Sequence, residues 1–161
     1  MTTRSDVRFM ADGGIELGAW LFLPASARLP SPAITMAHGY AGVREHGIAK
    51  FAEAFADAGF VVLLHDHRTF GVSGGEPRQD VDPWRQIADW RRAISYLESR
   101  PEVDSSRIGL WGTSYAGGHA RCWAPPNDVL PVWSPRSRRS ADTSKVFVAL
   151  HQRPFPPWRR R

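Results

Sequence analysis

Residues 107–117 read Arg-Ile-Gly-Leu-Trp-Gly-Thr-Ser-Tyr-Ala-Gly. This apolar run ends at a glycine and predicts a strand that leads into a helix through a tight turn, with Ser114 at its apex. In a nucleophile elbow of this kind, only small residues fit two positions before and two positions after the serine. Gly112 and Ala116 meet that requirement. The pattern is common by chance, so the surrounding sequence must separate a catalytic serine from a simple turn residue.

The sequence before this turn alternates between predicted strands and helices. The apolar periodicity predicts a hairpin of residues 7–10 and 15–23, strands at 33–37, 61–64 and 108–111, and helices at 45–58 and from Asp82-Pro83 to Pro101. We expect Trp84, Trp90 and Trp111 to fill the core. A hairpin followed by alternating strands and helices predicts an α/β fold, with a mostly parallel sheet and crossover helices.

Three loops of this fold leave the carboxyl ends of strands, where ligands bind to parallel sheets. They begin at His38, Asp66 and Ser114. Attack by a serine hydroxyl on a carbonyl builds negative charge on the oxygen, which fixed N–H donors must stabilise. The backbone N–H groups of Tyr115 and Tyr40 are the candidate donors, and Gly39 lets the first loop pass close to a substrate. The alternative is that His38-Gly39 is only a turn that ends a strand.

The second loop, residues 65–76, is rich in groups that resemble catalytic ones. We interpret most of them as structural, with Asp66 accepting backbone hydrogen bonds and pairing with Arg68. General acid or base chemistry by Asp66 is the alternative. A metal site made of His65, Asp66 and His67 is disfavoured, because adjacent residues of a strand point to opposite faces. We therefore predict neither a metal nor a cofactor.

Residues 1–120 resemble the N-terminal half of a serine-dependent α/β-hydrolase, similar to the dienelactone-hydrolase-like and Xaa-Pro-dipeptidyl-peptidase-like enzymes. The resemblance lies in residues 38–42, 66–75, 82–84 and 112–118. It implies an esterase-like enzyme that acts on a carboxylic ester or related acyl bond of a small molecule. It also implies that Ser114 is the nucleophile and that Tyr40 and Tyr115 are the oxyanion donors, supported by His38, Gly39, Gly112 and Asp66. Ala116 departs mildly from the usual glycine.

The groups that would activate the serine are missing from the resemblance. Family members continue much further after the elbow, to an acid and a histidine, whereas 47 residues follow Ser114 here. His119 lies in the helix that leaves the elbow and cannot easily reach the hydroxyl. His151 has no preceding strand and acid of the right kind. We therefore expect an activity impaired by truncation, and a catalytically inactive relative is the alternative.

Residues 121–161 form a segment of different composition. They hold 9 Lys and Arg against 2 Asp and Glu, whereas residues 1–120 hold 12 against 14. Seven of the 13 prolines lie in this tail, and periodicity is confined to residues 145–150. We expect a domain of residues 1–120 and an irregular, disordered Pro/Arg-rich tail. An out-of-frame GC-rich gene yields such a composition, so one hypothesis is a shifted reading frame.

A third function class uses the charge of this tail. In a binding module, the tail arginines would contact nucleic acid or another acidic surface; they are Arg136, Arg138, Arg139, Arg159, Arg160 and Arg161. Runs of charge are usually only solvated, so nucleic acid is a disfavoured partner.

Composition narrows the class of protein to which the chain can belong. The 42 % apolar content suits one globular domain, and no apolar stretch has the length of a signal peptide or a membrane span. Cys122, the single cysteine, cannot form an internal disulfide. We expect a cytoplasmic protein without membrane contact. The acyl group, the leaving group and the oligomeric state stay open.

Overall fold

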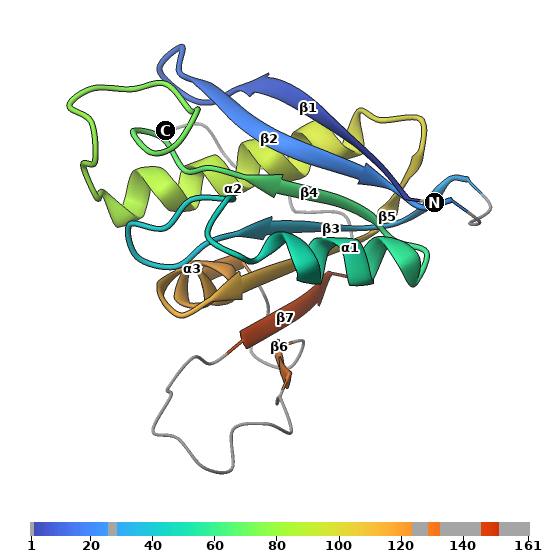
Figure 1. Cartoon of the computed structure of the whole chain (residues 1–161). Coiled ribbons are helices and arrows are strands. Elements are labelled where there is room, and N and C mark those ends of the chain that lie inside the picture. The colour runs from blue at the N-terminus through green and yellow to red at the C-terminus, as the bar shows by residue number, and fades with distance from the viewer. Residues whose placement is uncertain (1, 26–28, 124–128, 133–145, 152–161) are drawn as a thin grey trace.

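The computed structural model describes residues 2–25, 29–123, 129–132 and 146–151 of the chain. These residues form a mixed sheet with helices on both faces (Figure 1). The strands are β1 (Thr3–Met10), β2 (Glu16–Leu23), β3 (Ser31–Ala37), β4 (Val61–His65), β5 (Val103–Thr113), β6 (Val129–Val132) and β7 (Val146–His151). The helices are α1 (Ala49–Asp57), α2 (Pro83–Glu98) and α3 (Tyr115–Trp123).

The strands lie in the order β1-β2-β4-β3-β5-β7-β6. β1 and β2 form the predicted antiparallel hairpin, and β2 is antiparallel to β4. β3 is parallel to both β4 and β5, with α1 and α2 in the two crossover connections. The predicted α/β class is therefore confirmed. The carboxyl ends of β3, β4 and β5 meet at one edge of the sheet, on the left of Figure 1.

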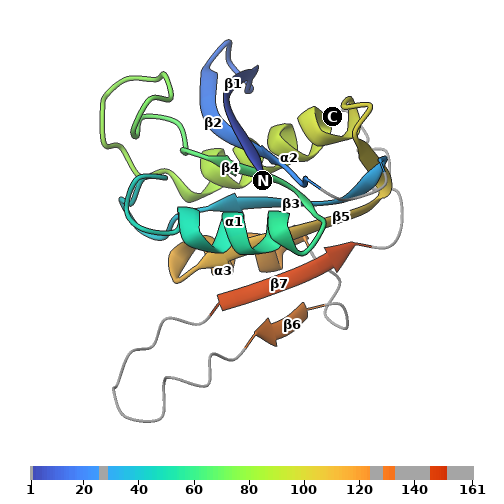
Figure 2. The same cartoon turned by 45° about the vertical axis from the view of Figure 1, so that its right-hand side comes forward.

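The two faces of the sheet bury different sets of side chains. α1 covers one face, and α2 and α3 cover the other, as the two views show (Figures 1 and 2). In β4, Val61 and Leu63 pack under α2, whereas Val62 and Leu64 pack under α1. Because successive side chains of a strand alternate between faces, a strand covered on both sides must be apolar throughout. This explains the uninterrupted apolar run on which the prediction of β4 rests.

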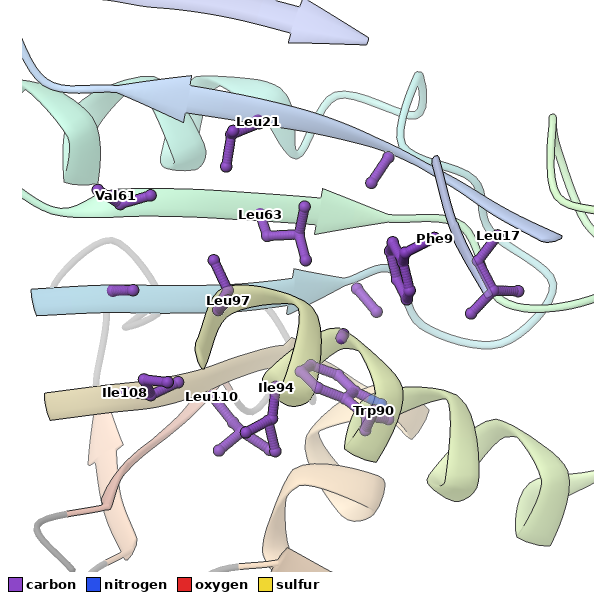
Figure 3. Packing of buried hydrophobic residues seen from close by; sticks show 14 of the residues in the cluster. Phe9, Leu17, Leu21, Val61, Leu63, Trp90, Ile94, Leu97, Ile108 and Leu110 are labelled. Carbon is purple, nitrogen blue, oxygen red and sulfur yellow. The ribbon is translucent and has the colours of Figure 1, made fainter. Parts of the chain in front are cut away.

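The larger core cluster lies between the sheet and α2. Trp90, Ile94 and Leu97 project from one side of α2 onto the strands (Figure 3). They meet Leu63 of β4 and Leu110 of β5, along with the smaller side chains of neighbouring strands. Trp90 and Leu97 are fully buried. This packing fixes α2, and with it the loop that connects β4 to α2.

The start of α2 confirms one prediction and corrects another. The helix begins after Asp82, as predicted, and the Asp82 side chain caps it by accepting hydrogen bonds from the N–H groups of Trp84 and Arg85, both at 3.0 Å. Trp90 and Trp111 are buried as predicted, but Trp84 is 76 % exposed. The first turn of α2 extends beyond the sheet edge, so helical spacing alone did not place Trp84 over the core.

α1 is shorter than predicted, and β5 is longer. Residues 44–47 form turns in place of a first helical turn, and Gly47 has a φ of 82° that a right-handed helix does not allow. β5 begins at Val103, before the apolar residues 108–111 by which it was predicted. Both differences lie at the ends of elements, where few core contacts determine the structure and boundaries are hard to predict.

The region expected to be irregular contributes to the sheet. α3 continues to Trp123, and β6 and β7 come from residues 121–161. β7 coincides with the one tail segment that shows periodicity, and it pairs antiparallel with β5. The pairing satisfies backbone groups of β5 that would otherwise be unpaired. The rest of the tail, including all six arginines of the hypothetical binding module, lies outside the described residues.

Neither α2, the longest helix, nor the other helices of the described ranges have the length and hydropathy of a membrane span.

Candidate active site

Ser114 stands alone in the turn between β5 and α3. β5 ends at Thr113 and α3 begins at Tyr115, so one residue makes the connection. Its φ of 52° lies in the left-handed region, and its side chain is exposed. The Ser114 carbonyl accepts hydrogen bonds from the N–H groups of Gly117 at 3.0 Å and Gly118 at 3.3 Å. The first turn of α3 therefore holds the backbone of Ser114 while its hydroxyl stays in solvent.

The small residues around Ser114 have a steric cause. A Cβ added at Gly112 would lie 2.5 Å from both the carbonyl carbon and the oxygen of Ala116. Ala116 is itself fully buried in the core cluster. The strand and the helix thus approach so closely that a side chain at Gly112 has no room, which is the condition that an elbow requires.

The loop after β3 passes directly against the elbow. A Cβ added at Gly39 would lie 3.0 Å from the Thr113 carbonyl oxygen and 3.1 Å from the Ser114 Cβ. Contacts this short leave no space for a side chain without a shift of the loop. Gly39 therefore lets two segments 75 positions apart in the sequence meet at the serine.

His38 does not take part in this contact. Its ring folds back onto Gly42, where any Cβ would clash with it, and it lies 5.6 Å from the ring of His46. The buried His38 Nδ1 has no hydrogen-bond partner in the described residues. His38 thus shapes its own loop, which agrees with a supporting role.

The two candidate oxyanion donors come from adjacent segments. Tyr115 is the first residue of α3, so its N–H has no acceptor within the helix. The N–H of Tyr40 donates none of the backbone hydrogen bonds found in the described loops. The rings of Tyr40 and Tyr115 pack edge to face, with centroids 5.6 Å apart. The oxyanion roles of both N–H groups stay predictions.

Asp66 joins two loops. Its buried carboxylate accepts hydrogen bonds from the N–H groups of Arg44 at 2.7 Å and Val72 at 3.2 Å. The Arg44 Nε lies 3.6 Å from its other oxygen. Burial raises the pKa of Asp66, although these hydrogen bonds oppose the shift. This geometry agrees with the structural interpretation of Asp66.

The predicted pairing of Asp66 with Arg68 is wrong. Arg68 binds Asp89 of α2, with an Nη2–Oδ1 distance of 2.6 Å and an Nε–Oδ1 distance of 3.0 Å. The backbone N–H of Arg68 also donates to Asp89, at 3.1 Å. Because backbone and side chain both bind α2, the chain turns Arg68 away from Asp66. Arg44 takes its place, and no local pattern marks a partner 22 residues away in the sequence.

Three histidines form a buried row behind the elbow. The ring of His67 lies 5.2 Å from that of His65 and 5.6 Å from that of His119. Burial lowers the pKa of His65 to about 3 and also lowers the pKa values of His67 and His119. All three are therefore neutral near pH 7. Within the described part of the chain, no group of His, Cys, Asp or Glu side chains is arranged to hold a metal ion.

The described residues contain no histidine hydrogen-bonded to the Ser114 hydroxyl. His119 packs its ring against Tyr115 at 4.5 Å and is turned to the buried row. The backbone of His151 lies opposite Ile108, six positions before Ser114 on β5. At roughly 3.3 Å per residue of strand, the two backbones are about 20 Å apart. These positions agree with the prediction that neither histidine is the base.

Comparison with known proteins places this arrangement in a family. Residues 12–137, which contain all three loops, match the family described as X-Pro dipeptidyl-peptidase (S15 family). The chain belongs to this family. The match confirms the predicted resemblance, and it continues past residue 120, so the predicted domain boundary there stays a prediction.

Individual relatives of this S15 chain carry different names. Over 125 residues it is 40% identical to the quorum-quenching protein AidA of Acinetobacter baumannii, covering 78% of this chain and 40% of AidA. It is 42% identical to the thiohydrolase aneE of Aspergillus aculeatus, covering 73% and 36% of the two chains. The crystal structure of the alpha/beta hydrolase GrgF from Penicillium sp. superposes with a TM-score of 0.68 at 35% identity, covering 73% and 39%. The S15 chain therefore spans about two fifths of the length of these relatives.

Proposed function

We propose that this chain carries the nucleophile and the oxyanion site of a serine hydrolase that cleaves a carboxylic ester or a related acyl bond, such as a thioester. Ser114 attacks the carbonyl carbon, and the N–H groups of Tyr40 and Tyr115 stabilise the oxyanion that forms. The observation that carries the proposal is the exposed Ser114 hydroxyl, in a left-handed turn against which the Gly39 loop packs. The names of the thiohydrolase and esterase relatives support the acyl substrate class.

The mechanism also requires a base, and the described residues supply none at Ser114. We propose that the chain by itself reacts slowly and in a single acylation step. Where a serine enzyme lacks its base, the oxyanion site and substrate binding still leave an acceleration of about 10³- to 10⁴-fold over water.

Exposed Cys122 cannot form an internal disulfide, and this supports a reducing, cytoplasmic compartment for the reaction.

A fluorophosphonate probe tests the nucleophile. The full chain is incubated with the probe, and the adduct is located by peptide mass spectrometry. We expect slow labelling of Ser114 that Ser114→Ala abolishes. The matched control is Ser105→Ala, which removes an exposed hydroxyl from the same strand and should leave labelling unchanged. Equal labelling of the wild type and Ser114→Ala would refute the nucleophile. Absence of labelling in the wild type would favour the catalytically inactive relative.

A further inference from the structure

A cavity of about 570 Å³ opens beside the candidate oxyanion loop. Its walls come from the loop after β3, which includes Tyr40 and His46, and from the loop between β4 and α2, which includes Phe70 and Arg78. These loops lie next to each other at the carboxyl edge of the sheet (Figures 1 and 2). Tyr40 belongs both to the cavity and to the contact with Tyr115. A molecule attacked by Ser114 could therefore extend into this cavity.

Arg78 gives the cavity a fixed positive charge. Its Nη1 donates to the Ser73 carbonyl at 2.5 Å, and its Nη2 donates to the Gly71 carbonyl at 2.8 Å. These two bonds orient the guanidinium, whose other N–H groups stay available. Across the described ranges no carboxylate lies within ion-pair distance of Arg78, whereas Arg85 and Arg107, for example, are both paired.

The floor of the cavity is held rigidly behind this guanidinium. The Thr69 N–H donates to the Gly74 carbonyl at 2.8 Å, and the Gln79 N–H donates to the Thr69 carbonyl at 3.0 Å. The Thr69 hydroxyl donates to the backbone carbonyl of Asp80 at 2.8 Å. Thr69 and Gln79 both have left-handed φ values, 68° and 63°, which cost energy for residues with a side chain. Strain of this kind persists where surrounding bonds enforce a shape, and here that shape is the cavity wall.

The other polar lining groups are compatible with an anion. The His46 Nδ1 accepts a hydrogen bond from the Val43 N–H at 3.4 Å, so in the neutral ring the proton lies on Nε2. His46 therefore offers a second donor. The cavity lining includes no Asp or Glu side chain. Among the lining side chains, Arg78 therefore carries the one permanent charge.

We propose that this cavity binds an anionic oxygen group of the acyl substrate, a carboxylate or a phosphate, and that Arg78 determines this specificity. The inference rests on the proposed function for its link to the acyl bond, because Tyr40 connects the two sites. The substrate class is then an ester or thioester with an acidic group a few bonds from the reacting carbonyl. Arg78 holds that group by a two-pronged, charge-assisted contact.

Isothermal titration calorimetry of the full chain tests the cavity with three probes. They are monomethyl glutarate, methyl phosphate and the neutral dimethyl glutarate. We expect at least one anion to bind in the millimolar range or better, and dimethyl glutarate to bind at least about tenfold more weakly, since about 1.4 kcal/mol corresponds to a factor of ten. Tighter binding of monomethyl glutarate identifies a carboxylate as the substrate group, and tighter binding of methyl phosphate identifies a phosphate. Equal affinity for the charged and neutral probes would overturn the proposal without any variant.

Variants then assign the contact to Arg78. Arg78→Gln should weaken anion binding about tenfold or more, and Arg78→Lys should weaken it less because the charge is kept. Arg85→Gln removes an exposed, paired guanidinium outside the cavity and should change the affinity less than twofold. Unchanged affinity in Arg78→Gln refutes the proposal. The cavity lining does not include Ser114, so calorimetry on the wild type tests the cavity even where fluorophosphonate labelling fails and favours a catalytically inactive relative.

Discussion

At the scale of single residues, the backbone of Ser114 carries a conformational cost. A φ of 52° brings the side chain of an L-residue close to its own backbone, at a cost of about 1–2 kcal/mol that glycine avoids. Residues in this region concentrate at functional sites, where neighbouring packing enforces them. Here the packing of Gly112 against Ala116 enforces the turn.

This cost predicts the stability of two variants at the serine. Ser114→Gly should raise the free energy of unfolding by about 1 kcal/mol over Ser114→Ala, because only glycine relieves the left-handed backbone. Urea unfolding followed by tryptophan fluorescence measures the difference. As a control, Ser105→Gly in the extended strand β5 should lower stability relative to Ser105→Ala. If Ser114→Gly is no more stable than Ser114→Ala, the turn is not strained.

A substitution at Gly39 should lower the reactivity of Ser114 and leave the fold intact. Gly39→Ala puts a methyl group 3.1 Å from the Ser114 Cβ, which should displace the Tyr40 N–H and slow fluorophosphonate labelling about tenfold, the effect of about 1.4 kcal/mol in the barrier. The fold should persist, since Tyr40 and Ala41, which follow Gly39, are exposed and the loop can shift outward there.

The matched control is Gly118→Ala, where an added methyl group meets nothing within 4 Å. It should label normally and be more stable by up to about 1 kcal/mol, because alanine favours the helix. Comparable labelling rates for the two alanine variants would contradict a role of the Gly39 loop at the serine.

The sequence reveals these residues to different degrees. The exclusion of side chains at Gly112 follows from a local pattern, since a strand-to-helix turn has strict steric needs. The partners of Asp66 and Arg68 do not. Which arginine reaches which carboxylate depends on how α2 and the loop after β3 pack on the sheet, and no spacing in the chain records that.

At the scale of elements, one buried ion pair attaches α2 to the end of β4. Asp89 is fully buried and receives hydrogen bonds from the N–H, Nε and Nη2 of Arg68. The apolar face of α2 fixes its distance from the sheet, while this pair fixes which part of α2 lies beside the loop after β4. The loop that lines the cavity of Arg78 begins at the same point.

Removing one partner of this pair should destabilise the protein strongly. Asp89→Ala leaves the buried Arg68 guanidinium without its hydrogen-bonded counter-charge, and we expect the free energy of unfolding to fall by about 3–5 kcal/mol. Arg85→Ala, which breaks an exposed pair with Asp82 in the same helix, should cost less than about 1 kcal/mol. Thermal and urea unfolding compare the two. Similar losses in both variants would show that burial of the pair is unimportant.

Elements that the core covers and that have clear end signals are the ones that the sequence predicts best. β4 is apolar at every position that the core demands, and α2 has a capping aspartate followed by a proline. Trp84 was misjudged because it lies three positions before Ile87, as Ile87 does before Trp90. The two three-residue steps together turn Trp84 about 120° away from Trp90 around the helix, and Trp84 is exposed. β6 was missed because strand pairing at a sheet edge depends on partners distant in sequence.

At the scale of the whole molecule, the row of His65, His67 and His119 makes stability depend on pH. Their pKa values are lowered in the folded state, that of His65 to about 3 from an ordinary 6.5. Above pH 6.5 both the folded and unfolded chains are neutral at these positions. Below it, the unfolded chain takes up protons that the folded chain refuses, so the stability present above pH 6.5 is lost toward pH 3.

The predicted slope is measurable between pH 7 and pH 5. Each buried histidine should reduce the free energy of unfolding by up to about 1.4 kcal/mol per pH unit once the unfolded form is protonated. Asp66 and Asp89, whose pKa values burial raises, act in the opposite direction at lower pH. The wild type should lose stability from pH 7 to pH 5 through His65, whereas Phe at this position does not titrate. The urea midpoint of the wild type should therefore fall relative to that of His65→Phe over this range. Parallel pH profiles would contradict the role of His65.

The edge-to-face contact between Tyr40 and Tyr115 has an evolutionary consequence. Two positions far apart in the chain share one ring contact, so a smaller side chain at either one removes that contact for both. Among descendants of a common ancestor, we expect the pair to drift together, with a bulky residue at one compensating for a small residue at the other. Correlated substitutions at the two positions across related genomes would therefore mark the site.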